Sequence, residues 1–187
     1  MEKRGLLTAL KRVAVVRGDL LMYVDEMRVG LWGQARRVWG LRGIPVIQKV
    51  QIVFDWRYLV LGVNPDSGKL TWDWVERIRQ EQLLPVIDRW AANVIIWDNA
   101  SAHKANKIAA LGRKLVFLPP YSPELDPAER IFRYLRPKIE GRLYPSLRAK
   151  QITVEHHLRQ LAADRKQVKS LVNWDWIQAA HDSLPLS

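Results

Sequence analysis

Two acidic residues stand out because of the segments that carry them. Asp98 directly follows the apolar run Val94–Trp97, and Glu129 stands at the start of a helical pattern, just after the proline-rich segment 118–127. An acid at the end of a buried strand and an acid in the first turn of a helix can share a cation when the two elements pack together. Mg²⁺ prefers such oxygen ligands and keeps several waters, so a few carboxylates suffice. The two segments therefore indicate a divalent-metal site.

A third carboxylate comes from an earlier segment. The apolar run Leu20–Val24 ends at Asp25 and Glu26, which predicts a buried strand that delivers both carboxylates at its C-terminal end. If that strand neighbours the one before Asp98, the two aspartates meet, and a nearby helix supplies Glu129. Three converging carboxylates repel one another without a cation. Two Mg²⁺ ions roughly 3.5–4 Å apart would relieve this repulsion and serve an in-line phosphoryl displacement. Asp25, Asp98 and Glu129 are therefore the candidate catalytic and metal-binding residues.

Each of these acids also has a purely structural interpretation. Asp126 can cap the helix, with Pro127 at its first position and Glu129 at its third, so Glu129 could complete a capping box. Taken singly, Asp98 could belong to a turn, and Asp25 could be a solvated charge at a strand end. Only the combination of the three acids favours metal binding.

Other residues near these acids could support them or contact a nucleic acid. These candidates are Glu26, Arg28, Arg36, Arg37, Arg42, Asn99, His103, Tyr121 and Arg133. Between positions 28 and 42, arginines interleave with Trp32 and Trp39, as on a nucleic-acid surface, although tryptophans in strands more often belong to a core. A lone histidine at a helix start, such as His103, is more often structural. The basic residues of segment 159–169 are most simply a solvated face.

Composition limits the class of protein. The chain has 187 residues, the size of one domain. Its 30 Lys and Arg against 19 Asp and Glu give a net charge of +11, which suits a polyanion such as nucleic acid but also a merely soluble basic protein. The absence of cysteine excludes a disulfide framework and thiolate zinc sites, and fits a reducing cytoplasm. No signal peptide or membrane span is expected.

The hydrophobic pattern predicts an α/β domain with a mixed sheet flanked by helices. Strands are expected at 20–24, about 36–41, 47–56, 58–63, 94–97 and 114–118. Helices are expected at about 71–91, 102–111, 127–140, 150–163 and 174–180, with a charged connection at 164–169. The first strands look successive and antiparallel, and the later strands alternate with helices.

Four blocks of sequence, in this order, resemble the catalytic domain of the mariner-like superfamily of DDE transposases, particularly its bacterial insertion-sequence branch. The blocks are Tyr23-Val24-Asp25-Glu26, Trp39-Gly40-Leu41-Arg42-Gly43, Ile96-Trp97-Asp98-Asn99-Ala100-Ser101-Ala102-His103, and the segment from Leu118 to Glu129. The resemblance covers about residues 18–140. The proline-rich fourth block is the most specific, and the first block is weak by itself.

The resemblance implies an RNase H-like fold in a single catalytic domain, with a core of about 18–140 and a helical extension of about 146–187. It implies that Asp25, Asp98 and Glu129 bind two Mg²⁺ or Mn²⁺ ions. Members of the family hydrolyse a phosphodiester at each transposon end and use the freed 3′-hydroxyl to attack target DNA, commonly at TA. The implied partner is double-stranded DNA in a bacterial nucleoid, bound by a homodimer.

The chain departs from the family pattern in two places. It has Asp126 where the family commonly has asparagine, which leaves open whether Glu124, Asp126 or Glu129 is the third ligand. Only 24 residues precede Asp25, so we expect no helix-turn-helix domain in this chain, and a separately encoded subunit could supply it. Two alternatives remain: an RNase H-like nuclease or resolvase that cuts without joining, and a decayed or domesticated DNA-binding protein without catalysis.

Overall fold

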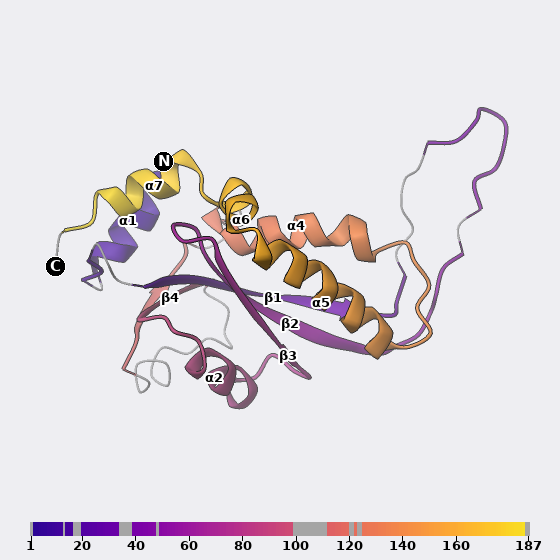
Figure 1. Ribbon diagram of the computed structural model, residues 1–187, viewed down its shortest axis with the longest axis horizontal. Helices are drawn as coiled ribbons and strands as arrows, with labels where there is room; N and C mark the ends of the chain where they lie inside the picture. Colours follow the sequence, from indigo (N-terminus) through magenta and orange to yellow (C-terminus); the bar gives the residue numbers. More distant parts are fainter. Residues whose placement is uncertain are drawn as a thin grey trace.

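Five strands form one mixed sheet in the order β3-β2-β1-β4-β5 (Figure 1). The computed structural model describes residues 2–12, 14–16, 20–33, 39–47, 49–98, 112–119, 122 and 125–185. The strands are β1 (Leu21–Gly30), β2 (Trp56–Asn64), β3 (Lys69–Val75), β4 (Val94–Trp97) and β5 (Lys114–Phe117). The first three are antiparallel, and β4 and β5 run parallel to β1. This arrangement confirms the predicted mixed sheet.

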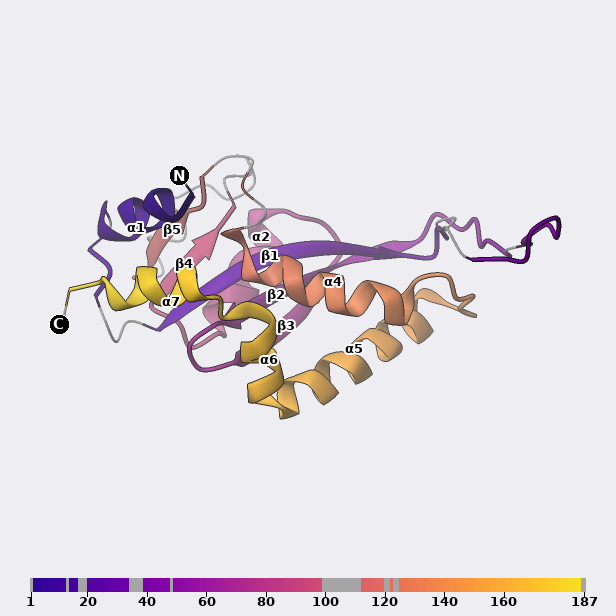
Figure 2. The same ribbon diagram turned by 90° about the horizontal axis from the view of Figure 1, so that it is seen from above.

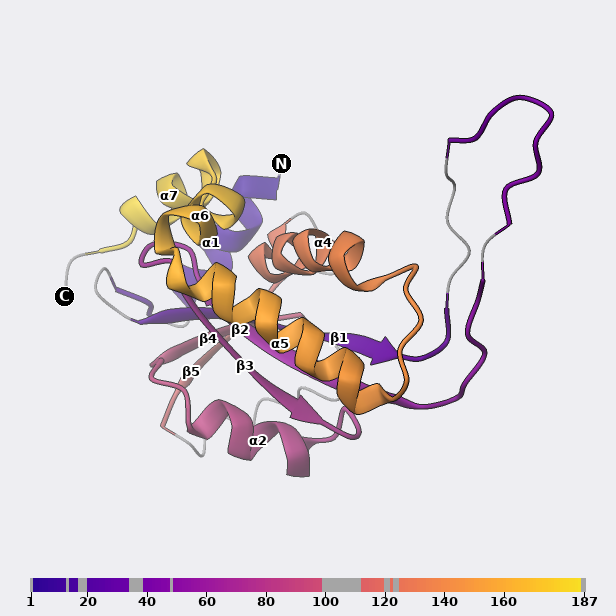
Figure 3. The same ribbon diagram turned by 45° about the vertical axis from the view of Figure 1, so that its right-hand side comes forward.

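Helices cover both faces of the sheet. They are α1 (Glu2–Arg12), α2 (Gln80–Asp88), α4 (Pro127–Ile139), α5 (Leu147–Ala163), α6 (Arg165–Val172) and α7 (Asp175–Asp182). Figure 3 shows α2 below the sheet and α4, α5 and α6 above it. Alternate residues of β1 supply the two cores: Met22 packs on the α2 side, and Tyr23 on the α4 side. None of the described helices is long and apolar enough to cross a membrane.

Helix α4 begins where the sequence predicted. The Asp126 carboxylate accepts a hydrogen bond of 2.8 Å from the amide of Ala128, and Pro127 occupies the first helical position. One side of the helix is apolar, so Ile131, Phe132 and Leu135 are buried against the sheet. The helix ends at Ile139, close to the expected end at about 140.

Strand β1 is longer than predicted. The sequence prediction ended the strand at Asp25 and Glu26, but β1 continues to Gly30 and pairs with β2 along this whole extension. The extension is stable because Met27 and Val29 are buried, so the alternating pattern continues past the two acids. Asp25 therefore lies inside β1, at the point where pairing with β4 ends.

Several other predicted helices and strands differ from those in the structure, and one falls outside the described residues. The helix expected at about 71–91 is two elements, β3 and α2, and the connection expected at 164–169 is part of α6, capped by Asp164. The described residues of the strands expected at 36–41 and 47–56 contain no strand before Trp56, and helix α1 was not predicted. The helix expected at 102–111 falls outside the described residues. The expected strands 58–63, 94–97 and 114–118 correspond to β2, β4 and β5.

The described residues between β1 and β2 project from the body (Figure 2). We call these residues, 31–33, 39–47 and 49–55, the arm. The apolar side chains that suggested a strand here are exposed, including Trp39 (101%) and Ile47 (91%). The alternation is present in the sequence, but no described strand pairs with the arm. Without such a neighbour, the pattern does not form a ladder.

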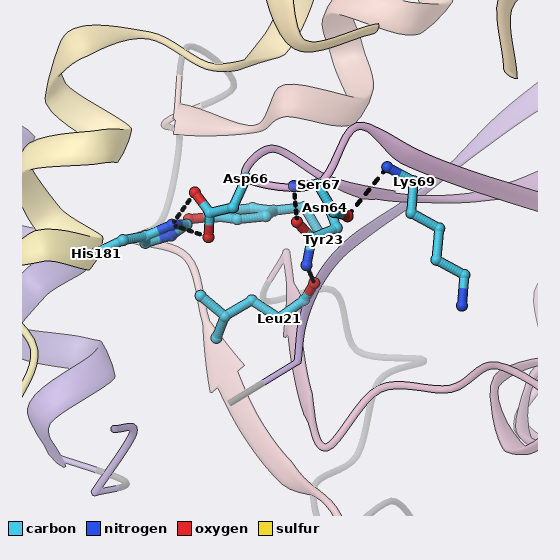
Figure 4. A network of polar contacts seen from close by, with 7 residues as sticks. All are labelled: Leu21, Tyr23, Asn64, Asp66, Ser67, Lys69 and His181. Atoms are coloured by element: carbon cyan, nitrogen blue, oxygen red, sulfur yellow. Dashed lines mark hydrogen bonds and ion pairs between the residues drawn. The ribbon is translucent and has the colours of Figure 1, made fainter. Parts of the chain in front are cut away.

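A polar network joins the C-terminal helix to the sheet (Figure 4). One ring nitrogen of His181, Nδ1, lies 2.9 Å from the Asp66 carboxylate, and the other, Nε2, lies 3.1 Å from the Tyr23 hydroxyl. A carboxylate only accepts hydrogen bonds, so Nδ1 donates to Asp66, and Nε2 accepts from the Tyr23 hydroxyl whenever that nitrogen carries no proton. Nearby, the side chain of Asn64 donates to the carbonyl of Leu21 at 2.7 Å. These contacts connect α7, the β2–β3 turn and β1.

We expect His181→Ala to lower the free energy of unfolding by about 1–3 kcal/mol, because it leaves the buried Tyr23 hydroxyl without its partner. The same change should cost less in a Tyr23→Phe background, where no hydroxyl is left unpaired. Urea unfolding of the four chains of this cycle measures the coupling. Strictly additive costs would show that the contact contributes nothing beyond packing.

Candidate active site

The register between β1 and β4 places two of the predicted acids side by side. The parallel ladder pairs Leu21 with Val94 and ends with Val24 opposite Trp97. The next residues along the two strands are Asp25 and Asp98. Tyr23 and Ile96, two residues before each acid, both face the core on the α4 side. Because side chains alternate between faces, Asp25 and Asp98 emerge towards the same side of the sheet.

Helix α4 brings two further carboxylates to this side. It packs against β1 and β2, with Asp126 at its N-cap and Glu129 in its first turn. Burial raises the pKa of Asp25 from 3.8 to about 8; a hydrogen bond from the amide of Glu26 opposes this shift, and the negative charges of Glu26, Glu129 and Asp98 add to it. The negative charges of Glu129 and Asp98 therefore act on Asp25, so the three predicted acids interact electrostatically.

Asp126, which caps the helix, is buried and lies near Asp25. It is only 4% exposed, and burial, followed by the charge of Asp25, raises its pKa well above the ordinary value. The alternative of a capping box is not seen among the described residues: the Asp126 carboxylate accepts from the amide of Ala128, and the carboxylate of Glu129 lies 3.7 Å from the guanidinium of Arg136. Asp126 thus holds the helix start, and Glu129 remains available at the site.

The other predicted candidates are distributed around these acids. Glu26 points to the opposite face of the sheet from Asp25, by strand alternation. Arg28 is exposed and lies over the ring of Trp56, while Arg42 is exposed on the arm. Arg133 is exposed one helical turn after Glu129. The remaining candidates, Arg36, Arg37, Asn99, His103, Tyr121 and Glu124, lie outside the described residues.

Sequence reasoning missed Arg136 as a partner of Glu129. The two residues are seven positions apart, which corresponds to two turns along one helix face. That spacing is the signal that could have identified the pair. As the side chains are placed, the described residues include no group of three or more histidines, aspartates or glutamates close enough to hold a metal ion. The acids lie near one another, but they would have to converge further to share a cation.

The raised pKa of Asp25 predicts how the stability of the metal-free protein depends on pH. Its carboxyl keeps its proton up to about pH 8 when folded, but only up to the ordinary pKa of 3.8 when unfolded. The folded state binds more protons between these values, so this group lowers the free energy of unfolding as the pH rises through this window. We expect Asp25→Asn to remove this contribution to the pH dependence of the free energy of unfolding. Urea unfolding at several pH values, in the presence of EDTA, measures that dependence. An unchanged slope would contradict the raised pKa.

Comparison with solved structures supports the fold. The chain is similar to Mos1 transposase in its paired-end complex with the left transposon end, with a TM-score of 0.67 and 14% sequence identity over 99% of this chain and 62% of that chain. It is also similar to a pre-cleavage Mos1 transpososome, with a TM-score of 0.69 and 13% identity over 97% of this chain and 60% of that chain. The chain thus spans about three fifths of these proteins. The likeness shows an RNase H-like fold, as predicted.

Sequence comparison gives the family. A search of the curated proteins found no significant match. The family described as DDE superfamily endonuclease matches residues 20–151, which is most of the chain and includes Asp25, Asp98, Asp126 and Glu129. The match begins just before β1 and ends inside α5. The fold, the position of the acids and this match lead to one conclusion: the chain belongs to the DDE superfamily endonucleases.

Proposed function

We propose that this chain is the catalytic domain of a DNA transposase. It would hydrolyse a phosphodiester at each transposon end and join the freed 3′-hydroxyl to target DNA. The observation that carries the proposal is the β1–β4 register, because it puts Asp25 beside Asp98 on the face where α4 presents Glu129. Both reaction steps are in-line displacements at phosphorus, so one site can serve both.

The acids are ligands of the kind that a pair of Mg²⁺ or Mn²⁺ ions would use. The donor set consists only of carboxylate oxygens, which these ions prefer. Burial and the neighbouring negative charges raise the pKa of Asp25, and a bound cation would oppose that shift. We propose that Asp25, Asp98 and Glu129 are the ligands. When bound, the two ions would activate the attacking oxygen and stabilise the leaving oxygen. Solved Mos1 paired-end complexes with Mn and with Mg support this choice of metals.

The protein's own residues would position the acids and the DNA. Asp25 lies in β1 and Asp98 directly follows β4. The pairing of these two strands fixes the backbone position of each acid. Asp126 caps α4 through the amide of Ala128 and so fixes the first turn that carries Glu129. Arg136 balances the charge of Glu129 in the metal-free protein. Rigid elements of this kind hold a reacting phosphate in a productive geometry more precisely than loops do.

Double-stranded DNA is the proposed substrate. The net charge of +11 attracts phosphates, and exposed arginines lie close to the acids, for example Arg133 on α4. The Mos1 structures contain paired transposon ends, which supports a homodimer that holds two ends together. We also propose that a separate helix-turn-helix subunit recognises the terminal repeats.

The proposal is tested with a labelled duplex that carries the inverted repeats flanking the gene, together with a target plasmid. We expect nicked ends and joined products with Mg²⁺ or Mn²⁺, and neither product with EDTA. Nicked ends without joined products would instead identify a nuclease or resolvase. Binding of the duplex without any cleavage would identify a non-catalytic DNA-binding protein.

A further inference from the structure

The base of the arm forms a cavity that the proposed chemistry does not use. Its volume is about 820 Å³, and it lies between the end of β1, the arm and the connection from α4 to α5. Cavities of about 300–1,000 Å³ are the usual size for small organic ligands and single nucleotides. Aromatic rings line one side, and Arg136, Glu140 and Arg142 line the side formed by α4 and the connection after it.

The walls of this cavity are held by specific contacts. The side chain of Gln51 donates to the carbonyl of Tyr144 at 2.9 Å and accepts from its amide at 3.2 Å, which ties the arm to the α4–α5 connection. The ammonium of Lys150 donates to the carbonyl of Gly30 at 2.6 Å, at the end of β1. Leu31 and Tyr144 also belong to a small separate hydrophobic cluster at this point. Specific hydrogen bonds and apolar packing therefore define the shape of the cavity.

The aromatic side of the cavity has the character of a stacking surface. The rings of Trp32 and Phe54 lie 4.5 Å apart between centroids, yet the two side chains are 47% and 74% exposed. Trp56 also lines the cavity and is 38% exposed. The guanidinium of Arg28 lies over its ring, 5.5 Å from the ring centroid. Exposed aromatic rings next to cations are the features with which proteins bind unpaired bases.

The basic side of the cavity leads back to the acids. Arg136 lines the cavity and also lies 3.7 Å from the carboxylate of Glu129. The backbone positions of the two residues are seven apart along α4, a rise of about 10 Å, which equals roughly three nucleotides of a stacked strand. Arg142 lies further along the same wall. A DNA strand whose scissile phosphate is at the acids can therefore reach the cavity within a few nucleotides.

We propose that this cavity binds unpaired nucleotides of the DNA strand next to the scissile phosphate. Their bases stack on Trp32 and Phe54, and their phosphates contact Arg136 and Arg142. This inference rests on the proposed function for its substrate, but it concerns binding and not chemistry. The base of the arm would therefore bind a DNA strand end that has separated from its complementary strand.

The test compares binding of two duplexes, one blunt and one with about five unpaired thymidines at one end. Fluorescence anisotropy is measured in the Asp25→Asn background with Ca²⁺, so that cleavage plays no part. We expect the unpaired tail to tighten binding by about tenfold. Trp32→Ala and Arg142→Ala should each remove most of that gain and leave blunt-duplex binding within about twofold, whereas Trp32→Phe should keep it. A 2-aminopurine in the tail should lose fluorescence on binding, unless Trp32 is replaced.

Two control variants separate the cavity from the rest of the surface. Trp39→Ala removes an exposed arm tryptophan outside the cavity, and Lys166→Ala removes an exposed positive charge on α6. Neither should affect the gain from the tail. The proposal is overturned by equal binding of the two duplexes to the unsubstituted arm, by equal losses from Trp39→Ala, or by cavity variants that change only self-association, which would indicate a protein-binding site. A chain that never cleaves DNA can still pass this test, and an active transposase can fail it.

Discussion

Replacing Asp25 by asparagine is expected to abolish metal-dependent DNA cleavage while leaving the chain folded and at least as stable at pH 8. Asparagine has nearly the same shape and can still accept the 2.8 Å hydrogen bond from the amide of Glu26. It cannot act as an anionic ligand. Loss of several kcal/mol of charge stabilisation in the transition state corresponds to a rate at least about a thousandfold lower.

Stability gives this prediction its second readout. Asp25 carries an uncompensated, largely buried charge at high pH, so its removal should not lower the free energy of unfolding. Asp175→Asn is the matched control, because it removes one carboxylate from an exposed position on α7. Cleavage assays and urea unfolding of the three chains are compared at pH 8. Retained cleavage by Asp25→Asn would remove Asp25 from the proposed ligands, and an unfolded variant would contradict the stability argument.

Local signals explain the elements that the sequence predicted correctly. Four consecutive apolar residues mark β4, and an acidic cap followed by proline marks the start of α4. Segment 71–91 misled the prediction because Trp74, Ile78 and Leu83 recur at helix-compatible spacing. In the structure, Trp74 belongs to β3, which forms a hairpin with β2 across the turn after Asn64. Pairing with β2 overrides the helical pattern there, and no local signal reveals such a partner.

The acidic residues of the site could be selected from the sequence, but their spatial arrangement could not. Asp25 and Asp98 are 73 residues apart in the sequence, and only the β1–β4 register makes them neighbours. The sequence prediction therefore had to assume that their strands adjoin. The charge of Asp126 beside Asp25 was also invisible, because a helix cap is recognised from local spacing while its distance to β1 depends on how α4 packs. Long-range packing decides both features.

The contrast between Asp126 and Glu129 supports Glu129 as the proposed third ligand. Both acids interact with Asp25, but Asp126 is buried and its carboxylate is occupied by the amide of Ala128. Asparagine caps helices as well as aspartate does, so Asp126→Asn should keep the helix start and remove one repelling charge. We expect this variant to keep cleavage activity of the same order as the unsubstituted chain, and to weaken the pH dependence of stability caused by Asp25.

Glu129→Gln should instead lower cleavage by about a thousandfold, because it removes an anionic ligand from a site that needs its charge. The variant should stay folded, since the side chain of Glu129 is 38% exposed and its described ionic partner, Arg136, is itself exposed. Cleavage of the labelled duplex with Mg²⁺ measures both substitutions, and Asp126→Ala adds a control that loses the cap at a cost of about 1 kcal/mol. If Asp126→Asn were inactive and Glu129→Gln active, the third ligand would be Asp126, and the helix cap and the metal site would share one carboxylate.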